Sequence, residues 1–358
     1  MRLSIDPESC ARHTVRQTLG VVIFGRRRDR DPKAGIAAFW SWWAHAKDKL
    51  DVALTAGELS GIDRTLSSRV SAIHPDIAWQ LGTGRHARHS LVLSPEGSPS
   101  LRTITERWLR AGPGADEAWE YHPARQVDLT AFESELQLGR RSFDPGKARF
   151  GTEVDQDRAR VHVLVHHPDF PELDDADRLR ASFLLLDWAL GEDDVERWLG
   201  EIRVTGVEQP HDVAGVREVV AELSGQYGKD DWTLLEGIDE RGRTLEARVR
   251  VPFPRMDHPL FDLHGAVRLN YEPGPDGQPP DDEAIALETI THGLLGRLGR
   301  SAVLGAVVTT AGVRGLHLYA DSEGVVPGQV EAWAAQQPRP VTVEWTPDPG
   351  WEILRAFY

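Results

Sequence analysis

The sequence predicts a mixed α+β protein of two domains, and three observations support this fold class. The chain has 358 residues, which is more than a single hydrophobic core usually serves. Segments with the helical spacing of apolar residues occur in turn with segments of period-two alternation, which is typical of strands. The polar stretch Gly225–Asp231 separates two such series. We therefore expect an N-terminal α+β domain at residues 1–228 and a second α+β domain at residues 229–358.

The N-terminal domain begins with a predicted strand at Val15–Phe24, which ends at the basic turn Arg26–Arg28. A helix that begins near Pro32 follows, and it contains the most aromatic stretch of the chain. Its large apolar residues recur at spacings of three, four and seven, as one helix face requires: Ile36, Phe39, Trp40, Trp43 and Leu50. We interpret this face as the anchor of the N-terminal core, with an aromatic ligand cage as the alternative.

Further helices and strands fill the rest of this domain. Acidic residues at Asp174 and Asp175 suit a helix N-terminus, and Gly191 stands where that helix should end. The expected helices are Leu59–Ile73, Pro99–Leu109, Asp174–Leu190 and Val213–Leu223. The expected strands are Ile77–Leu81, Ser90–Leu93, Trp119–Arg125, Phe150–Val154, Arg160–Val165 and Trp198–Val204.

The second domain begins with a predicted hairpin, Thr233–Ile238 with Thr244–Val251. After it the segments follow the order β-α-β-β-α-β: Gly265–Tyr271, Asp281–Leu298, Ala302–Thr309, Arg314–Ala320, Val330–Ala335 and Pro340–Trp345. This order is that of the ferredoxin-like split βαβ motif. We therefore expect an α+β fold whose C-terminal domain is ferredoxin-like, with an extra N-terminal β-hairpin.

The composition excludes several classes of site and partner. The formal net charge is -15, which argues against general binding of nucleic acid or anionic membranes. Cys10 is the only cysteine, so the chain has no intrachain disulfide and no thiolate zinc cluster. The first residues lack the apolar core of a signal peptide, and no stretch approaches a membrane span. We expect a cytoplasmic protein without a cofactor.

Three stretches resemble a bacterial family known as domain of unknown function 695. They are the aromatic run Phe39–Trp42, the run Leu186–Glu192, and the region from Asp231 to Trp345, which includes Gly312–Tyr319. The resemblance implies a ferredoxin-like C-terminal half that is distantly similar to the bacterial regulator of ribonuclease E activity B. It implies no catalytic residues. Because that regulator acts by contacting another protein, the resemblance favours an interaction module.

Four polar residues are predicted to form a binding surface on the C-terminal sheet. Arg268 and Asn270 lie two residues apart on the first strand of the split motif, and His317 and Tyr319 lie two apart on the third. Since these strands are neighbours and side chains alternate, all four should share one face, away from the helices. We expect at least Arg268 and Tyr319 to be accessible. The alternatives are burial under the preceding hairpin or the N-terminal domain, and base stacking on an RNA-binding face.

The sequence indicates catalytic and metal-ligating residues less clearly than it indicates the binding surface. His162 and His166 would lie about 13 Å apart along a strand, too far for one ion to bridge, so we expect no metal site. Asp187 and Glu192 lie on either side of a helix end, where we favour a capping role over catalysis. Phosphate-binding glycine loops and a nucleophile elbow are absent from the sequence.

Taken together, these features predict a protein-interaction or regulatory module that is not an enzyme, with another protein as its partner. Nucleic acid and membranes are not expected partners. One alternative is a hydrolase that uses carboxylates and histidines between the domains, and its hallmark would be a concave pocket joining Asp187, Glu192 and a histidine. The other alternative is an RNA-binding sheet face.

Overall fold

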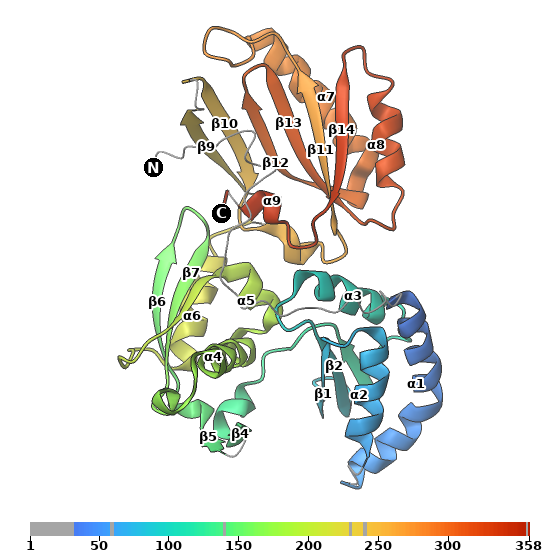
Figure 1. Ribbon diagram of the computed structural model, residues 1–358, viewed down its shortest axis with the longest axis vertical. Coiled ribbons are helices and arrows are strands. Elements are labelled where there is room, and N and C mark those ends of the chain that lie inside the picture. The colour runs from blue at the N-terminus through green and yellow to red at the C-terminus, as the bar shows by residue number, and fades with distance from the viewer. Residues whose placement is uncertain (1–31, 58–60, 139–140, 229–230, 239–241, 356) are drawn as a thin grey trace. The chain divides into compact units, whose positions relative to one another are not determined.

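The computed structural model describes residues 32–57, 61–138, 141–228, 231–238, 242–355 and 357–358 (Figure 1). Helices and strands are mixed along the whole of this part, so the prediction of an α+β protein is confirmed. The described residues form two compact units, which are residues 32–228 and residues 231–358. Cys10, the expected strand Val15–Phe24 and the basic turn Arg26–Arg28 lie outside the described residues.

The N-terminal unit begins with three helices and a three-stranded sheet of order β1-β2-β3. Strands β1 and β2 are antiparallel, and β3 runs parallel to β2 after the connecting helix α3. Pro99 stands at the first position of α3, where its missing N–H costs no hydrogen bond. The elements are α1 (Pro32–Thr55), α2 (Ile62–Ile73), β1 (Ala78–Thr83), β2 (His89–Ser94), α3 (Pro99–Arg110) and β3 (Trp119–His122).

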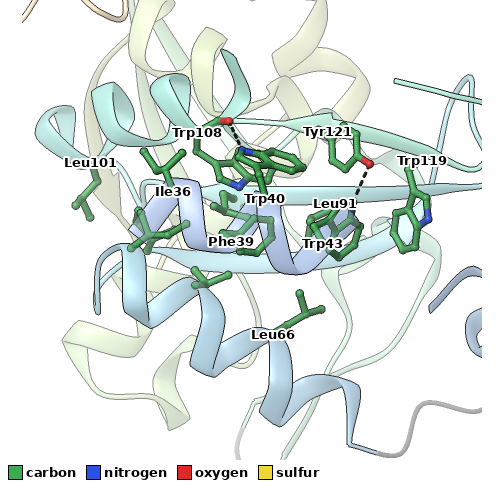
Figure 2. Packing of buried hydrophobic residues seen from close by; sticks show 14 of the residues in the cluster. Ile36, Phe39, Trp40, Trp43, Leu66, Leu91, Leu101, Trp108, Trp119 and Tyr121 are labelled. Carbon is green, nitrogen blue, oxygen red and sulfur yellow. Dashed lines mark hydrogen bonds between the residues drawn. The ribbon is translucent and has the colours of Figure 1, made fainter. Parts of the chain in front are cut away.

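An aromatic cluster forms the core of this part, as Figure 2 shows. The Trp43 indole is fully buried, and its Nε1–H donates to the Tyr121 hydroxyl at 2.8 Å. Trp40 stacks on Trp108 with ring centroids 4.9 Å apart, and its Nε1–H donates to the Trp108 carbonyl at 2.8 Å. Phe39 is buried between them and Trp43. The prediction that one face of α1 anchors the N-terminal core is confirmed.

The second part of the N-terminal unit contains another three-stranded sheet, of order β6-β7-β8, and a short hairpin, β4–β5. Helix α4 begins at an Asp174 cap, whose side chain accepts from the Asp177 N–H, and it ends before Gly191, which has φ 84°. The elements are β4 (Leu136–Leu138), β5 (Arg141–Phe143), β6 (Arg149–Asp155), β7 (Arg160–His166), α4 (Asp175–Leu190), α5 (Glu192–Trp198), β8 (Leu199–Val204) and α6 (Val213–Ser224).

The C-terminal unit is built on one antiparallel six-stranded sheet of order β14-β11-β13-β12-β10-β9. The expected hairpin does not cover this sheet but extends it, because β10 pairs with β12. The strands are β9 (Trp232–Ile238), β10 (Thr244–Arg250), β11 (Leu263–Asn270), β12 (Ala302–Thr310), β13 (Val313–Ala320) and β14 (Val341–Pro347).

Two helices, α7 (Asp281–Leu298) and α8 (Val326–Ala334), pack on one face of this sheet (Figure 1). Leu287 and Leu294 of α7 and Trp333 of α8 are buried against the apolar side chains of the strands. A short helix, α9 (Glu352–Arg355), lies on the opposite face, where the Leu354 side chain packs against Gly305. No helix that the structure describes is both long and apolar enough to cross a membrane.

Candidate functional site

The four predicted binding residues lie on the face of the C-terminal sheet that faces away from α7 and α8. Strands β11 and β13 pair so that Arg268 is opposite Gly315 and Ala266 is opposite His317. One further pair along, His264 is opposite Tyr319. We call the side chains of His264, Arg268, Asn270, His317 and Tyr319 the polar face. The alternation of side chains along each strand thus brings the predicted residues together.

One end of the polar face is open to solvent. Arg268 and Asn270 are both exposed, as expected for Arg268. The Arg268 guanidinium lies 3.1 Å from a carboxylate oxygen of Glu344 on β14, and both side chains are about half exposed, at 49% and 64%. An ion pair this exposed contributes about 0–1 kcal/mol, so Arg268 can exchange Glu344 for another acidic group at little cost.

The other end of the polar face is sealed, which contradicts the expectation that Tyr319 is accessible. The Tyr319 ring is fully buried and stacks on Trp351 with ring centroids 4.0 Å apart. Its hydroxyl donates to Asp348 Oδ2 at 2.7 Å. The segment Asp348–Arg355, which follows the last strand, covers this ring. A buried hydroxyl needs a partner, and Asp348 supplies it.

Two histidines lie between the open and the sealed end. His264 Nε2 and His317 Nδ1 are 3.0 Å apart, and His264 is buried while His317 is half-buried. Burial lowers the pKa of both imidazoles, and for His317 the neighbouring His264 lowers the pKa further. The Arg268 charge acts in the same direction on the pKa of both. Both rings are therefore neutral at pH 7, and one donates its N–H to the other.

A second polar cluster lies in the N-terminal unit, where two buried carboxylates share one guanidinium. Asp187 is in the last turn of α4, and Glu192 is the first residue of α5. Arg125 Nη1 lies 3.2 Å from Asp187 Oδ2 and 3.2 Å from Glu192 Oε1. The second terminal nitrogen of this guanidinium, Nη2, contacts the Glu96 carboxylate. Three carboxylates therefore face a single guanidinium.

Glu192 holds α5 to the loop that follows β3. Its carboxylate accepts the Ser94 hydroxyl at 2.6 Å and the backbone N–H of Arg125 at 2.6 Å. Its own backbone N–H donates to the Arg125 carbonyl at 3.1 Å. At the start of α5, its charge also meets the favourable end of the helix dipole. These contacts support the structural role expected for Glu192.

Asp187 is the more unusual carboxylate. Burial, and then the charge of Glu192, raise its pKa to about 8, although Arg125 acts in the opposite direction. Burial also raises the pKa of Glu192. Asp187 is therefore largely protonated at pH 7, which is the state that a general acid needs. Within the described residues, however, none of the hydrogen bonds or ion pairs of Asp187 and Glu192 involves a histidine.

The chain matches no protein-family model and no curated protein. The resemblance to the domain-of-unknown-function 695 family therefore stays a prediction that rests on the residues quoted above. Across the described ranges, no group of three or more His, Cys, Asp or Glu side chains could hold a metal ion.

Three contributors to these clusters were not anticipated. Arg125 was expected to end a strand, but β3 ends at His122, so Arg125 is free to turn toward the carboxylates. His264 precedes the expected strand Gly265–Tyr271 by one residue, although its spacing of four from Arg268 would have placed it on the polar face. Trp351 follows the last expected strand, and no short-range pattern indicates that it folds back onto Tyr319.

Proposed function

We propose that this protein is a protein-interaction module, not an enzyme, and that it binds its partner through the open end of the polar face. The observation that carries the proposal is the exposure of the Arg268 and Asn270 side chains to solvent. Both are exposed on the same face of β11, and the ion pair of Arg268 with Glu344 is weak because both side chains are about half exposed. Arginine is the residue best suited to recognise a carboxylate in two hydrogen bonds, so the partner surface should be acidic at this point.

The burial of Tyr319 at the sealed end of the polar face disfavours RNA as the partner. Base stacking requires an exposed aromatic ring, and Tyr319 is covered by Trp351. The acidic balance of the chain also opposes a phosphate backbone. Protein recognition is therefore favoured over RNA binding. We place this binding in the cytoplasm, because the single cysteine fits a reducing compartment.

The test is an affinity capture from cell extract with three forms of the full chain. Arg268→Glu reverses the charge on the polar face, whereas Arg297→Glu reverses an exposed charge on α7, on the helix side of the sheet. The wild type and Arg297→Glu should enrich the same protein, and Arg268→Glu should lose it. Equal recovery by all three forms, or no enriched protein at all, contradicts the proposal.

We also propose that the C-terminal unit belongs to the ferredoxin-like class, as the family resemblance implies. The order β14-β11-β13-β12 supports this, with α7 following β11 and α8 following β13. In this interpretation β9 and β10 are an added hairpin at the β12 edge.

A second candidate function is acid–base hydrolysis at Asp187, which is favoured by one observation, the pKa of about 8 of its carboxyl group. Glu192 is an unsuitable second catalyst because Ser94 and Arg125 already occupy both of its oxygens. Ester and phosphoester hydrolysis by the wild type and Asp187→Asn separates the two functions. Turnover by the wild type that is lost in Asp187→Asn supports catalysis, and equal rates oppose it.

A further inference from the structure

The two ring nitrogens of His317 differ in their surroundings. Nδ1 lies 3.0 Å from His264 Nε2, so a hydrogen bond occupies this side of the ring. Among the residues that the structure describes, none forms a hydrogen bond with the other nitrogen, Nε2. A half-buried polar atom without a partner gives up a hydrogen bond that it would make in water. A group from another molecule can restore that bond.

His317 Nε2 is directed along β13 toward the row of the sheet that contains Arg268. A Cβ added at Gly315, two residues before His317, would lie 3.8 Å from this nitrogen. Gly315 is directly opposite Arg268 on β11, whereas the row of His264 and Tyr319 lies on the other side of His317. The ring of His317 therefore presents Nδ1 to the sealed end of the polar face and Nε2 to its open end.

Polar and small residues alternate at this place in the sheet. His317 is opposite Ala266, and Gly315 is opposite Arg268, so the two polar residues are diagonal neighbours on paired strands. Such neighbours are about 7–8 Å apart, which a long side chain can span. Ala266 and Gly315 are both partly exposed, and neither has a side chain that could separate the two polar groups. One small group of a partner can therefore contact both.

A carboxylate is the group that suits these two donors. The Arg268 guanidinium is always charged, and its N–H groups match the two oxygens of a carboxylate. A neutral imidazole whose Nδ1 accepts a hydrogen bond has its proton on Nε2. When His264 Nε2–H donates to His317 Nδ1, the His317 Nε2–H is therefore available to the same carboxylate.

We propose that Arg268 and His317 together bind one side-chain carboxylate of the protein partner, and that His264 is the positioning residue that keeps the His317 proton on Nε2. This inference rests on the proposed function, because it concerns the same open end of the polar face. Chain-terminal carboxylates are captured by unpaired backbone N–H groups, whereas β11 and β13 each pair with a strand on both sides. A phosphate group would bring about two negative charges close to Glu344. An aspartate or glutamate side chain is therefore the ligand.

The experiment measures the Kd of the captured partner for variants of the full chain by calorimetric titration. His317→Leu should weaken binding about tenfold because a hydrogen bond to a charged group is lost, whereas His317→Gln keeps an N–H donor and should stay within about twofold of the wild type. His264→Leu should also weaken binding, and His264→Gln should restore it, although residue 264 does not contact the partner. Wild-type Kd values for both leucine variants, or equal losses in the leucine and glutamine variants, would overturn the proposal.

Gly315→Val tests the same site without removing a donor. The backbone at Gly315 has no positive φ, so valine fits this strand, and its side chain would lie beside His317 Nε2, where the carboxylate should bind. Thr342→Val is the matched control, because Thr342 is opposite Arg268 on its other side. Gly315→Val should weaken binding about tenfold and Thr342→Val should leave the Kd unchanged. Equal Kd values for these two variants would contradict the assignment of His317.

Failure of this proposal can be distinguished from failure of the proposed function. If no partner is captured, or if Arg268→Glu captures it as well as the wild type does, both proposals are wrong. If Arg268→Glu loses the partner but His317→Leu and Gly315→Val keep the wild-type Kd, only the carboxylate site is wrong. Phosphatase treatment of the partner, or a glycine extension of its C-terminus, should leave the Kd unchanged. Weaker binding after either treatment would assign the site to a phosphate or a chain terminus and would overturn the side-chain carboxylate.

Discussion

At the scale of single residues, Asp187 is the most unusual, because its carboxyl group is buried although the charged form of this group is unfavourable in the protein interior. A carboxyl group is rarely buried unless it is paired, and here Arg125 must serve Asp187, Glu192 and Glu96 together. Helix α4 must nevertheless place Asp187 inward, because Leu186 and Leu190 on the same helix are core residues. Because burial raises its pKa to about 8, the carboxyl group is largely protonated at pH 7.

Asp187 makes the N-terminal unit less stable as the pH rises. Its folded pKa of about 8 lies above the ordinary value of 3.8, so its stabilising contribution is complete below pH 4 and is lost as the pH approaches 8. Within this window the free energy of unfolding should fall by about 1.4 kcal/mol per pH unit from this group. Asp187→Asn should reduce that slope and be more stable than the wild type at pH 8. Urea unfolding at several pH values measures both effects.

The control for this prediction is Asp175→Asn, because the Asp175 side chain at the start of α4 is fully exposed. It should leave the slope between pH 4 and pH 8 as in the wild type. If Asp187→Asn also leaves it unchanged, Asp187 is ionised in the folded protein and our description of the cluster is wrong.

Trp43 should be the most costly aromatic residue to truncate. It is fully buried, contacts Phe39 and Trp119, and donates a hydrogen bond to Tyr121. Trp43→Ala should reduce the free energy of unfolding by about 3–5 kcal/mol. Phe183→Ala, at a position 42% exposed, should have a much smaller effect on the melting temperature. A melting temperature equal to that of the wild type, with loss of partner binding, would instead identify the aromatic cluster as a recognition site.

At the scale of elements, the local pattern of apolar and polar residues was sufficient to predict a helix or a strand wherever one face of the segment is buried. The expected helix Asp281–Leu298 is observed with the same bounds, because apolar residues recur at helical spacing and three acidic residues occupy its first turn. Exposure of Arg268 followed from the alternation along β11. Burial of Tyr319 did not, because it depends on Trp351, 32 residues further along, and no local pattern records such a contact. For the same reason the sequence did not indicate that β10 joins β12.

The C-terminal segment should be held in place mainly by Trp351. This residue is fully buried, stacks on Tyr319, and donates its Nε1–H to the Phe261 carbonyl at 2.7 Å. Trp351→Ala should cost about 3–5 kcal/mol and should expose Tyr319 to solvent. Thermal unfolding gives the first effect, and tyrosine iodination with mass spectrometry gives the second. Ile285→Ala, at a position 69% exposed, is the control. Protection of Tyr319 in Trp351→Ala would mean that another group covers it.

At the scale of the whole molecule, the chain consists of two compact units that meet in sequence at Lys229 and Asp230. The polar stretch Gly225–Asp231 and the change of pattern there are the basis on which the sequence predicts two domains. The pairing of the hairpin with β12 enlarges the C-terminal sheet to six strands, and Trp351 covers Tyr319 at one end of the polar face. Arg268 and Asn270 are exposed on β11, which is paired with a strand on each side, and such a support is what a docking surface needs.

Limited proteolysis should cut the full chain first between Gly225 and Asp230, because this polar, glycine-containing stretch joins the two compact units. The larger fragments should begin or end within this stretch, as mass spectrometry can establish. First cleavage inside Ala302–Ala320, which contains the central strands β12 and β13, would refute the division.

The central claim is that the exposed end of the polar face binds a protein partner, and the affinity of the captured partner for the full chain tests it most directly. Calorimetric titration should give at least a tenfold weaker Kd for the double variant Arg268→Ala with Asn270→Ala, which corresponds to about 1.4 kcal/mol. Arg297→Ala, on the helix side of the sheet, should leave the Kd unchanged. An equal Kd for the double variant and the wild type would contradict the claim.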